Sequence, residues 1–235
     1  MRQIFLDTET TGLSPDNGDR IVEIGCVELI NRKLTGNNRH FYVNPGRDSH
    51  EEALKIHGIT TEFLKDKPVF AAVVDDLLAY LQDAEELVIH NAPFDMGFLN
   101  KELNLVGRPA LHQFVVKVTD SLAMAKAMYP GKRNSLDSLC DRLGVDNSGR
   151  KLHGALLDAE LLADVYINLT RGQDALLMDV GAGQGSHDNT VRIDFSSFDL
   201  VVLVANDQEL AAHEDVLMQI DKASGGKTAW RNEVH

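Results

Sequence analysis

Short apolar runs fill the first part of the chain, and such runs are typical of β-strands. Ile4 to Leu6 begins a buried strand, Ile21–Ile30 is rich in isoleucine, valine and leucine, and His40–Val43 forms a third run. Because the connections between these runs are short, we expect an antiparallel meander at the start of the fold.

Farther along, apolar residues recur at the spacing of amphipathic helices, with short strand-like runs between them. Helices are predicted over 51–57, 68–81, 94–105, 121–128, 136–143 and 156–169, and strands over 87–90 and 114–118. Antiparallel strands followed by alternating helices and strands predict an α/β domain, with a mixed sheet flanked by helices.

The composition changes after Arg171, where four glycines lie among polar residues up to Asn189. This pattern predicts a flexible linker. Beyond it, Phe195–Ala205 is a strand candidate, and Asn206 can cap a helix that begins at Asp207. One strand and one helix bury too little surface to fold alone, so we expect them to fold against a partner. The predicted organisation is a domain over 1–171, a linker over 172–194 and a tail over 195–235.

The bulk composition is that of a globular protein: of 235 residues, 43% are hydrophobic and 25% charged. We expect no membrane partner, because we find neither a signal peptide nor an apolar run long enough to span a bilayer. Cys26 and Cys140 lie in apolar segments and are interpreted as buried thiols of a cytoplasmic protein. The net charge of -13 excludes nucleic-acid binding through a broad basic surface.

Asp7 and Glu9 stand two residues apart where the first strand ends. In extended chain, side chains two apart point to the same face, so the two carboxylates converge and would repel each other. A divalent cation would remove that repulsion, and oxygen ligands of this kind suit Mg²⁺ or Mn²⁺. Taken alone, such a pair is more often a strand-end aspartate and a solvated glutamate.

Two later motifs supply further acids. Asp95 in the segment HNAPFD lies in the first turn of a predicted helix, where the helix dipole alone would favour an acid. Asp158 lies at the edge of an apolar helix face, where an unpaired acid is costly. His153 precedes it on a loop, and a lone histidine there is usually an ordinary surface residue.

In combination the motifs are specific. D-x-E, H-N-x-x-F-D and H-x-x-x-x-D, in this order, resemble the DEDD exonuclease superfamily in its histidine form. Segments 54–60, 118–139 and 198–213 also look like the epsilon subunits of bacterial DNA polymerase III, so the resemblance runs from end to end. It implies an RNase H-like catalytic domain. It also implies 3'-5' proofreading exonuclease activity that releases mismatched DNA 3' ends as 5'-monophosphates.

The resemblance gives each motif residue a role. Asp7, Glu9 and Asp158 match the metal ligands, Asp95 matches a fourth acid that acts through water, and His153 matches the general base. Contacts to the terminal nucleotide are implied for the three metal ligands and for Thr10, Thr11, Gly12, Leu13, Glu52 and His57. Two Mg²⁺ or Mn²⁺ ions about 4 Å apart can activate a water and stabilise the leaving oxygen. A histidine can accept that water's proton near neutral pH.

The resemblance also implies protein partners. Gln173 and Leu176 match a short peptide that binds the sliding clamp, and Met178 stands where an aromatic residue is commonest. The tail over 195–235 resembles the anchor to the polymerase alpha subunit, and a small theta-like subunit is a further candidate partner. A partner that grips DNA would explain how so acidic a chain works on a polyanion, because tethering raises the local concentration.

The sequence is also compatible with two other functions. One is a stand-alone RNA or oligonucleotide 3'-5' exonuclease on the same fold, which would have the same catalytic residues. The other is a polymerase accessory protein that binds without cutting. The clamp-like peptide and the tail argue against the first, and the complete set of acids with His153 argues against the second.

Overall fold

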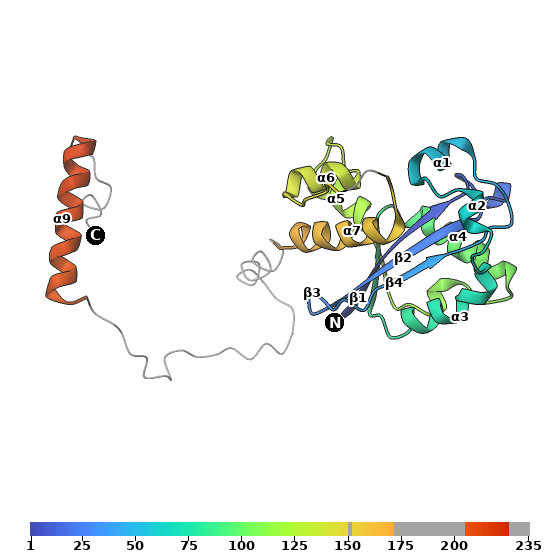
Figure 1. Cartoon of the computed structure of the whole chain (residues 1–235). Helices are drawn as coiled ribbons and strands as arrows, with labels where there is room; N and C mark the ends of the chain where they lie inside the picture. Colours follow the sequence, from blue (N-terminus) through green and yellow to red (C-terminus); the bar gives the residue numbers. More distant parts are fainter. Residues whose placement is uncertain (150–151, 172–204, 226–235) are drawn as a thin grey trace. The chain divides into compact units, whose positions relative to one another are not determined.

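The computed structural model describes residues 1–149, 152–171 and 205–225 (Figure 1). The chain divides into two compact units, Met1–Gly183 and Gln184–His235, and each is described by itself. Within the described residues, no helix combines the length and the apolar composition that crossing a membrane requires.

A mixed β-sheet forms the centre of the first unit (Figure 1). Its strand order is β3-β2-β1-β5-β6, and β4 also pairs with β2. The antiparallel strands are β1 (Arg2–Thr10), β2 (Ile21–Ile30), β3 (Lys33–Leu34) and β4 (Arg39–Tyr42). The strands β5 (Glu86–Ile89) and β6 (Val118–Asp120) continue the sheet parallel to β1. The expected antiparallel start and the mixed sheet are thus confirmed.

Helices cover this sheet. They are α1 (Glu51–His57), α2 (Thr61–Leu64), α3 (Phe70–Leu81), α4 (Ala92–Leu105), α5 (Ser121–Met128), α6 (Leu136–Leu143) and α7 (Ala155–Leu169). Two 3₁₀ turns, η1 (Pro15–Asn17) and η2 (Leu111–Gln113), complete the described elements of this unit. The predicted helices are confirmed, and the architecture is an RNase H-like α/β fold.

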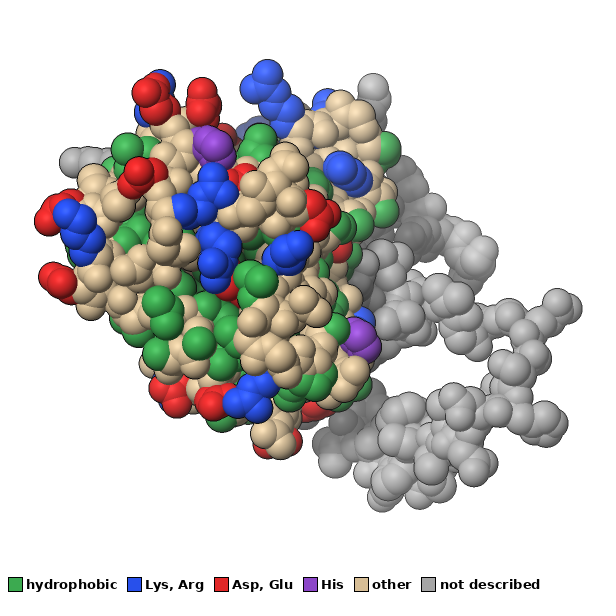
Figure 2. Space-filling view, turned by 90° about the vertical axis from the view of Figure 1, so that its right-hand side faces the viewer, with side chains coloured by type: hydrophobic (Ala, Val, Ile, Leu, Met, Phe, Trp, Pro, Cys, Tyr) green, Lys and Arg blue, Asp and Glu red, His purple; other side chains and the backbone are tan. Residues whose placement is uncertain are grey.

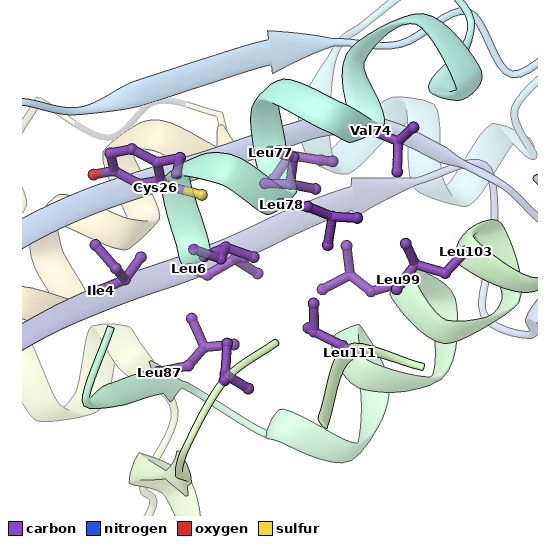
Figure 3. Packing of buried hydrophobic residues seen from close by; sticks show 14 of the residues in the cluster. Ile4, Leu6, Cys26, Val74, Leu77, Leu78, Leu87, Leu99, Leu103 and Leu111 are labelled. Carbon is purple, nitrogen blue, oxygen red and sulfur yellow. The ribbon is translucent and has the colours of Figure 1, made fainter. Parts of the chain in front are cut away.

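The alternation of side chains along β1 divides the core into two layers. Ile4 and Leu6 pack with side chains of α3 and α4 (Figure 3). Phe5 points to the other face and packs with α6 and α7. Because β1 is buried on both faces, its apolar run is continuous rather than alternating. Cys26 and Cys140 are buried free thiols, as expected.

Three local features differ from the sequence-based expectation. In the described part of the first unit, the last strand is Val118–Asp120 and not 114–118. Val115 is buried but Val116 is 86% exposed, so the apolar run before Val118 crosses an irregular stretch. The strand β1 extends through Asp7 and Glu9 and does not end before them. The short elements β3 and α2 hold too few apolar residues to give a periodic signal.

The described part of the second unit is the helix α9 (Asp207–Ser224). The Asn206 side chain accepts hydrogen bonds from the backbone N–H groups of Gln208 and Glu209, and Glu209 closes a capping box. The predicted helix and its cap are therefore confirmed. The linker over 172–194, the clamp-like peptide Gln173–Met178 and all but the last residue of the strand candidate 195–205 lie outside the described residues.

Candidate active site

The first and third motifs meet at the sheet. One side-chain ligand atom each from Glu9, His153 and Asp158 lie within 4.8 Å of one another. The Nδ1 atom of His153 lies 3.4 Å from an Asp158 carboxylate oxygen. Glu9 and Asp158 are buried, whereas about half of the His153 side chain is exposed. Two acids and an imidazole from opposite ends of the domain thus form one cluster, which we call the acid cluster.

The strand β2 positions the start of α7, and with it His153 and Asp158. A Cβ on Gly25 would lie 2.2 Å from the carbonyl carbon of Ala155, so only glycine permits this close approach. The Ala155 N–H donates to a Glu23 carboxylate oxygen at 3.1 Å. The other oxygen of Glu23 lies 2.6 Å from Nε2 of His40. The helix therefore begins at a fixed point on the sheet, directly across from the β1 acids, because Asp7 pairs with Gly25 and Glu9 with Glu23.

Asp95, from the second motif, lies in the first turn of α4 and is almost fully buried. The Thr8 hydroxyl donates to an Asp95 carboxylate oxygen at 2.7 Å. Burial raises the pKa of Asp95 to about 7, in spite of that hydrogen bond, and the charge of Asp120 adds to the increase. Thr8 therefore ties Asp95 to the strand that carries Asp7 and Glu9.

An apolar cleft of about 480 Å³ adjoins the acid cluster on the side of Glu9. Leu13 is 85% exposed and Ile56 48% exposed in this cleft, and Phe94 lines it as well. These surfaces suit the flat face of an aromatic ring. Among the residues implied to contact a terminal nucleotide, the cleft wall includes Glu9, Thr10, Gly12, Leu13, Glu52 and His57.

His57 places a buried polar atom in the wall of this cleft. Its Nδ1 accepts a hydrogen bond from the Ile59 N–H at 2.9 Å, so the neutral ring carries its proton on Nε2. Burial lowers the pKa of His57, and the Glu23 charge and the nearby Thr10 carbonyl oppose that change. Within the described part of the chain, Nε2 is buried without a partner in hydrogen-bonding geometry.

The turn after β1 has a support that the sequence analysis missed. Thr11 is fully buried and does not line the cleft, because its hydroxyl donates to Asp19 at 3.1 Å and accepts from the Arg20 N–H. A Cβ on Gly12 would lie 2.4 Å from Asp19. Burial would raise the pKa of Asp19, but the hydrogen bonds from Ser14 and Thr11 and the charges of Arg47 and His50 lower it. Asp19 therefore remains a charged support for the turn.

The donor set fits a divalent cation. Asp7 lines a second hollow together with His153 and Asp158, so it borders the acid cluster even though its oxygens are not within the 4.8 Å group. Carboxylates gathered in this way repel one another unless a cation is present. Oxygen-rich sites of this kind are typical of Mg²⁺ and Mn²⁺. A divalent cation is thus the cofactor class to which the site is suited.

The comparisons with known proteins agree with this geometry. The exonuclease family model RNase_T matches residues 4–166. The DNA polymerase III subunit epsilon of Pasteurella multocida is 49% identical over 243 residues, which cover 99% of this chain and 94% of the relative. The subunit of the same name from Salmonella typhimurium is 52% identical over 239 residues, covering 98% and 97%.

Solved structures give the same fold. Exonuclease X in complex with 5' overhanging duplex DNA is 26% identical, has a TM-score of 0.57, and the match covers 73% of this chain and 93% of that one. Exonuclease I of E. coli in complex with an oligonucleotide is 19% identical with a TM-score of 0.66, covering 75% and 42%, and supports the fold alone. The chain belongs to the exonuclease family and, over nearly its whole length, to the family of DNA polymerase III epsilon subunits.

Proposed function

We propose that this protein is the 3'-5' proofreading exonuclease subunit of a DNA polymerase III, and that it removes mismatched 3'-terminal nucleotides as 5'-monophosphates. The observation that carries the proposal is the acid cluster, in which Glu9, Asp158 and His153 lie within 4.8 Å beside an apolar cleft. Membership of the exonuclease family gives nuclease chemistry, and the epsilon relatives give the replicative context.

Each residue of the cluster has a role in the proposed hydrolysis. Asp7, Glu9 and Asp158 would hold two Mg²⁺ or Mn²⁺ ions, and Asp95 would be the fourth acid of the site. When bound, such ions supply positive charge that stabilises the attacked phosphate and the leaving oxygen. His153 removes the proton of the attacking water, and its contact with Asp158 orients the imidazole.

The apolar cleft takes the terminal nucleoside. Leu13, Ile56 and Phe94 offer apolar surface to the base, and apolar contacts of this kind do not distinguish one base from another. Glu52 and His57 line the cleft and would bind the sugar hydroxyls of the terminal nucleotide. In this proposal the cleft holds the nucleoside at a free 3' end.

In this proposal the remaining parts of the chain bind other proteins. The segment 173–178 binds the sliding clamp through Gln173, Leu176 and Met178, and 172–194 serves as the linker. The tail over 195–235 binds the polymerase alpha subunit. The domain over 1–171 carries the hydrolysis, and the tether keeps it near the primer end.

The direct test is release of nucleoside monophosphate from labelled primers, with Mg²⁺ or Mn²⁺ and with EDTA. We expect mismatched and single-stranded 3' ends to be cut faster than paired ends, and we expect no cutting in EDTA or by Asp7→Ala. His112→Ala is the matched control, because His112 is exposed and lines neither hollow.

Other results would favour other functions. Faster cutting of short RNA than of DNA would favour an RNA-processing exonuclease. Failure to cut any substrate with either metal, in a protein that folds and binds the polymerase, would favour a non-catalytic accessory subunit.

A further inference from the structure

A second hollow of about 480 Å³ adjoins the acid cluster on the side of Asp7, His153 and Asp158. Glu9 lines the apolar cleft and not this hollow, so the cluster stands between the two. A phosphodiester held at the cluster with its terminal nucleoside in the cleft must continue on its other side. The second hollow is the open space available there.

The second hollow differs from the apolar cleft in its charge. Lys126 and Lys132 line it, and both side chains are exposed. Within the described part of the chain neither makes an ion pair. Many other cations of this unit stand beside an acid, as Arg20 does beside Glu102 at 2.6 Å. On the face shown in Figure 2, basic side chains are interleaved with acidic ones.

The turn that carries Lys132 is held in place by α6. The Arg142 guanidinium donates to the Arg133 carbonyl at 2.7 Å and to the Asn134 side chain at 3.0 Å. It also lies over the Tyr129 ring, 4.6 Å from the centroid. The Asn134 amide in turn donates to the Lys132 carbonyl at 3.1 Å. The position of Lys132 is therefore built into the fold, as is that of Lys126 on α5.

The first turn of α6 also faces the second hollow, through Ser135, Leu136 and Asp137. A helix N-terminus favours anions, because its first N–H groups lack helix partners. Asp137 opposes this effect with its own negative charge. The two lysines together with the helix start nevertheless make this wall suited to a phosphate chain.

We propose that the second hollow binds the sugar-phosphate backbone of the strand upstream of the bond that is cut, with Lys126 and Lys132 contacting its phosphates. This inference rests on the proposed exonuclease function and adds the path of the substrate. It also explains how an acidic chain holds a polyanion: two local cations, rather than a basic surface, grip the strand next to the cluster.

The test uses the full chain and two substrates. One is a 5'-labelled single-stranded deoxythymidine oligonucleotide. The other is the p-nitrophenyl ester of thymidine 5'-monophosphate, which has a terminal nucleoside but no upstream strand. The double substitution Lys126→Ala with Lys132→Ala should raise the KM for the oligonucleotide about tenfold. The slope of log affinity against log salt concentration should become shallower by about 0.7 for each phosphate contact that is lost. Turnover of the ester should be retained.

The control is Lys33→Ala with Lys65→Ala, which removes the same charge at exposed positions outside both hollows. The charge-conserving pair Lys126→Arg and Lys132→Arg should restore most of the oligonucleotide affinity. The inference is overturned if the alanine pair and the control have the same KM for the oligonucleotide. It is also overturned if the alanine pair loses turnover of the ester and of the oligonucleotide to the same extent. If the unmodified protein cuts neither substrate, the proposed function itself fails.

Discussion

The contact between His153 and Asp158 brings together two residues whose roles can be separated by substitution. His153→Ala removes the proposed base but leaves the carboxylates, so kcat on a single-stranded oligonucleotide should fall by about 10²- to 10⁴-fold. The KM should change little, because the apolar cleft and the acids stay intact. Steady-state kinetics in Mg²⁺ measure both constants. A large rise in KM with unchanged kcat would assign His153 to binding instead.

Asp158→Asn should act differently at the same contact. It removes a ligand charge, so it should weaken Mn²⁺ binding as well as lower kcat, whereas His153→Ala should bind Mn²⁺ nearly as well as the unmodified protein. Calorimetric titration with Mn²⁺ measures this directly. Equal loss of Mn²⁺ binding in the two variants would identify His153 as a metal ligand rather than a base. The distances within the acid cluster, all within 4.8 Å, are compatible with that role as well.

Because the Asp95 carboxyl is buried, we expect the free energy of unfolding to depend on pH. Burial raises the pKa of Asp95 to about 7 in the folded chain, whereas an unfolded aspartate titrates near about 4. Between these values the folded state binds more protons than the unfolded state, so this contribution to stability is present at low pH and is lost as the pH rises toward 7. Asp95→Asn keeps an acceptor for Thr8 and removes the titration.

The corresponding measurement is chemical denaturation in EDTA at pH 4 and pH 8. Relative to the unmodified protein, Asp95→Asn should gain about 2 to 4 kcal/mol of unfolding free energy between the two pH values. The exposed substitution Asp66→Asn is the control and should show no such change. A parallel pH dependence for Asp95→Asn and the unmodified protein would show that the buried acid does not titrate in this range.

At the scale of elements, the site depends on how α7 begins against β2. Gly25→Ala would place a Cβ 2.2 Å from the Ala155 backbone, so the start of α7 must move away from the sheet. A displacement of about 1 Å at Asp158 and His153 is enough to lower activity about 10²-fold. We expect that loss together with a moderate destabilisation of about 1–3 kcal/mol.

Gly97→Ala provides the matched control on α4. A Cβ there would meet only the Pro15 side chain at an ordinary 3.8 Å, and alanine favours a helix over glycine by about 0.5–1 kcal/mol. This variant should be at least as stable as the unmodified protein and as active. Thermal unfolding and oligonucleotide hydrolysis test both variants. Full activity in Gly25→Ala would mean that α7 can shift without moving the cluster.

The same elements show what the sequence alone can predict. The Asp7–Glu9 spacing, the helix start at Asp95 and the His153–Asp158 pair are local patterns. Of these residues, the structure brings Glu9, His153 and Asp158 within 4.8 Å of one another. Glu23 and Ala155 are 132 residues apart, and no local pattern links them, so the anchoring of α7 could not be predicted. Gly25 inside an apolar strand was the one available signal, since such a glycine often marks a close backbone approach. The apolar run 114–118 predicts a strand, which is wrong before Val118 because apolar content does not reveal hydrogen-bonding partners.

At the scale of the whole molecule, the division of labour proposed for the two units rests on α9. Four of its apolar side chains are more than 40% exposed: Leu210, Val216, Met218 and Ile220. A helix that presents so much apolar surface is suited to a protein partner, and the proposed partner is the polymerase alpha subunit. In the proposed function, the catalytic residues all belong to the first unit.

Ile220→Asp and Gln219→Asp test this division with the same new charge at neighbouring positions of α9. Ile220→Asp would bury a carboxylate in an apolar contact, so its affinity for the polymerase subunit should fall at least about tenfold, or about 1.4 kcal/mol. Gln219→Asp should bind normally, and both should hydrolyse a single-stranded oligonucleotide at the unmodified rate. Removal of mismatches from a primer held by the polymerase should then slow only in Ile220→Asp, because only that variant loses its tether. Equal affinities for the two variants would place the polymerase contact elsewhere in the tail, and a loss of oligonucleotide hydrolysis would show that the second unit takes part in catalysis.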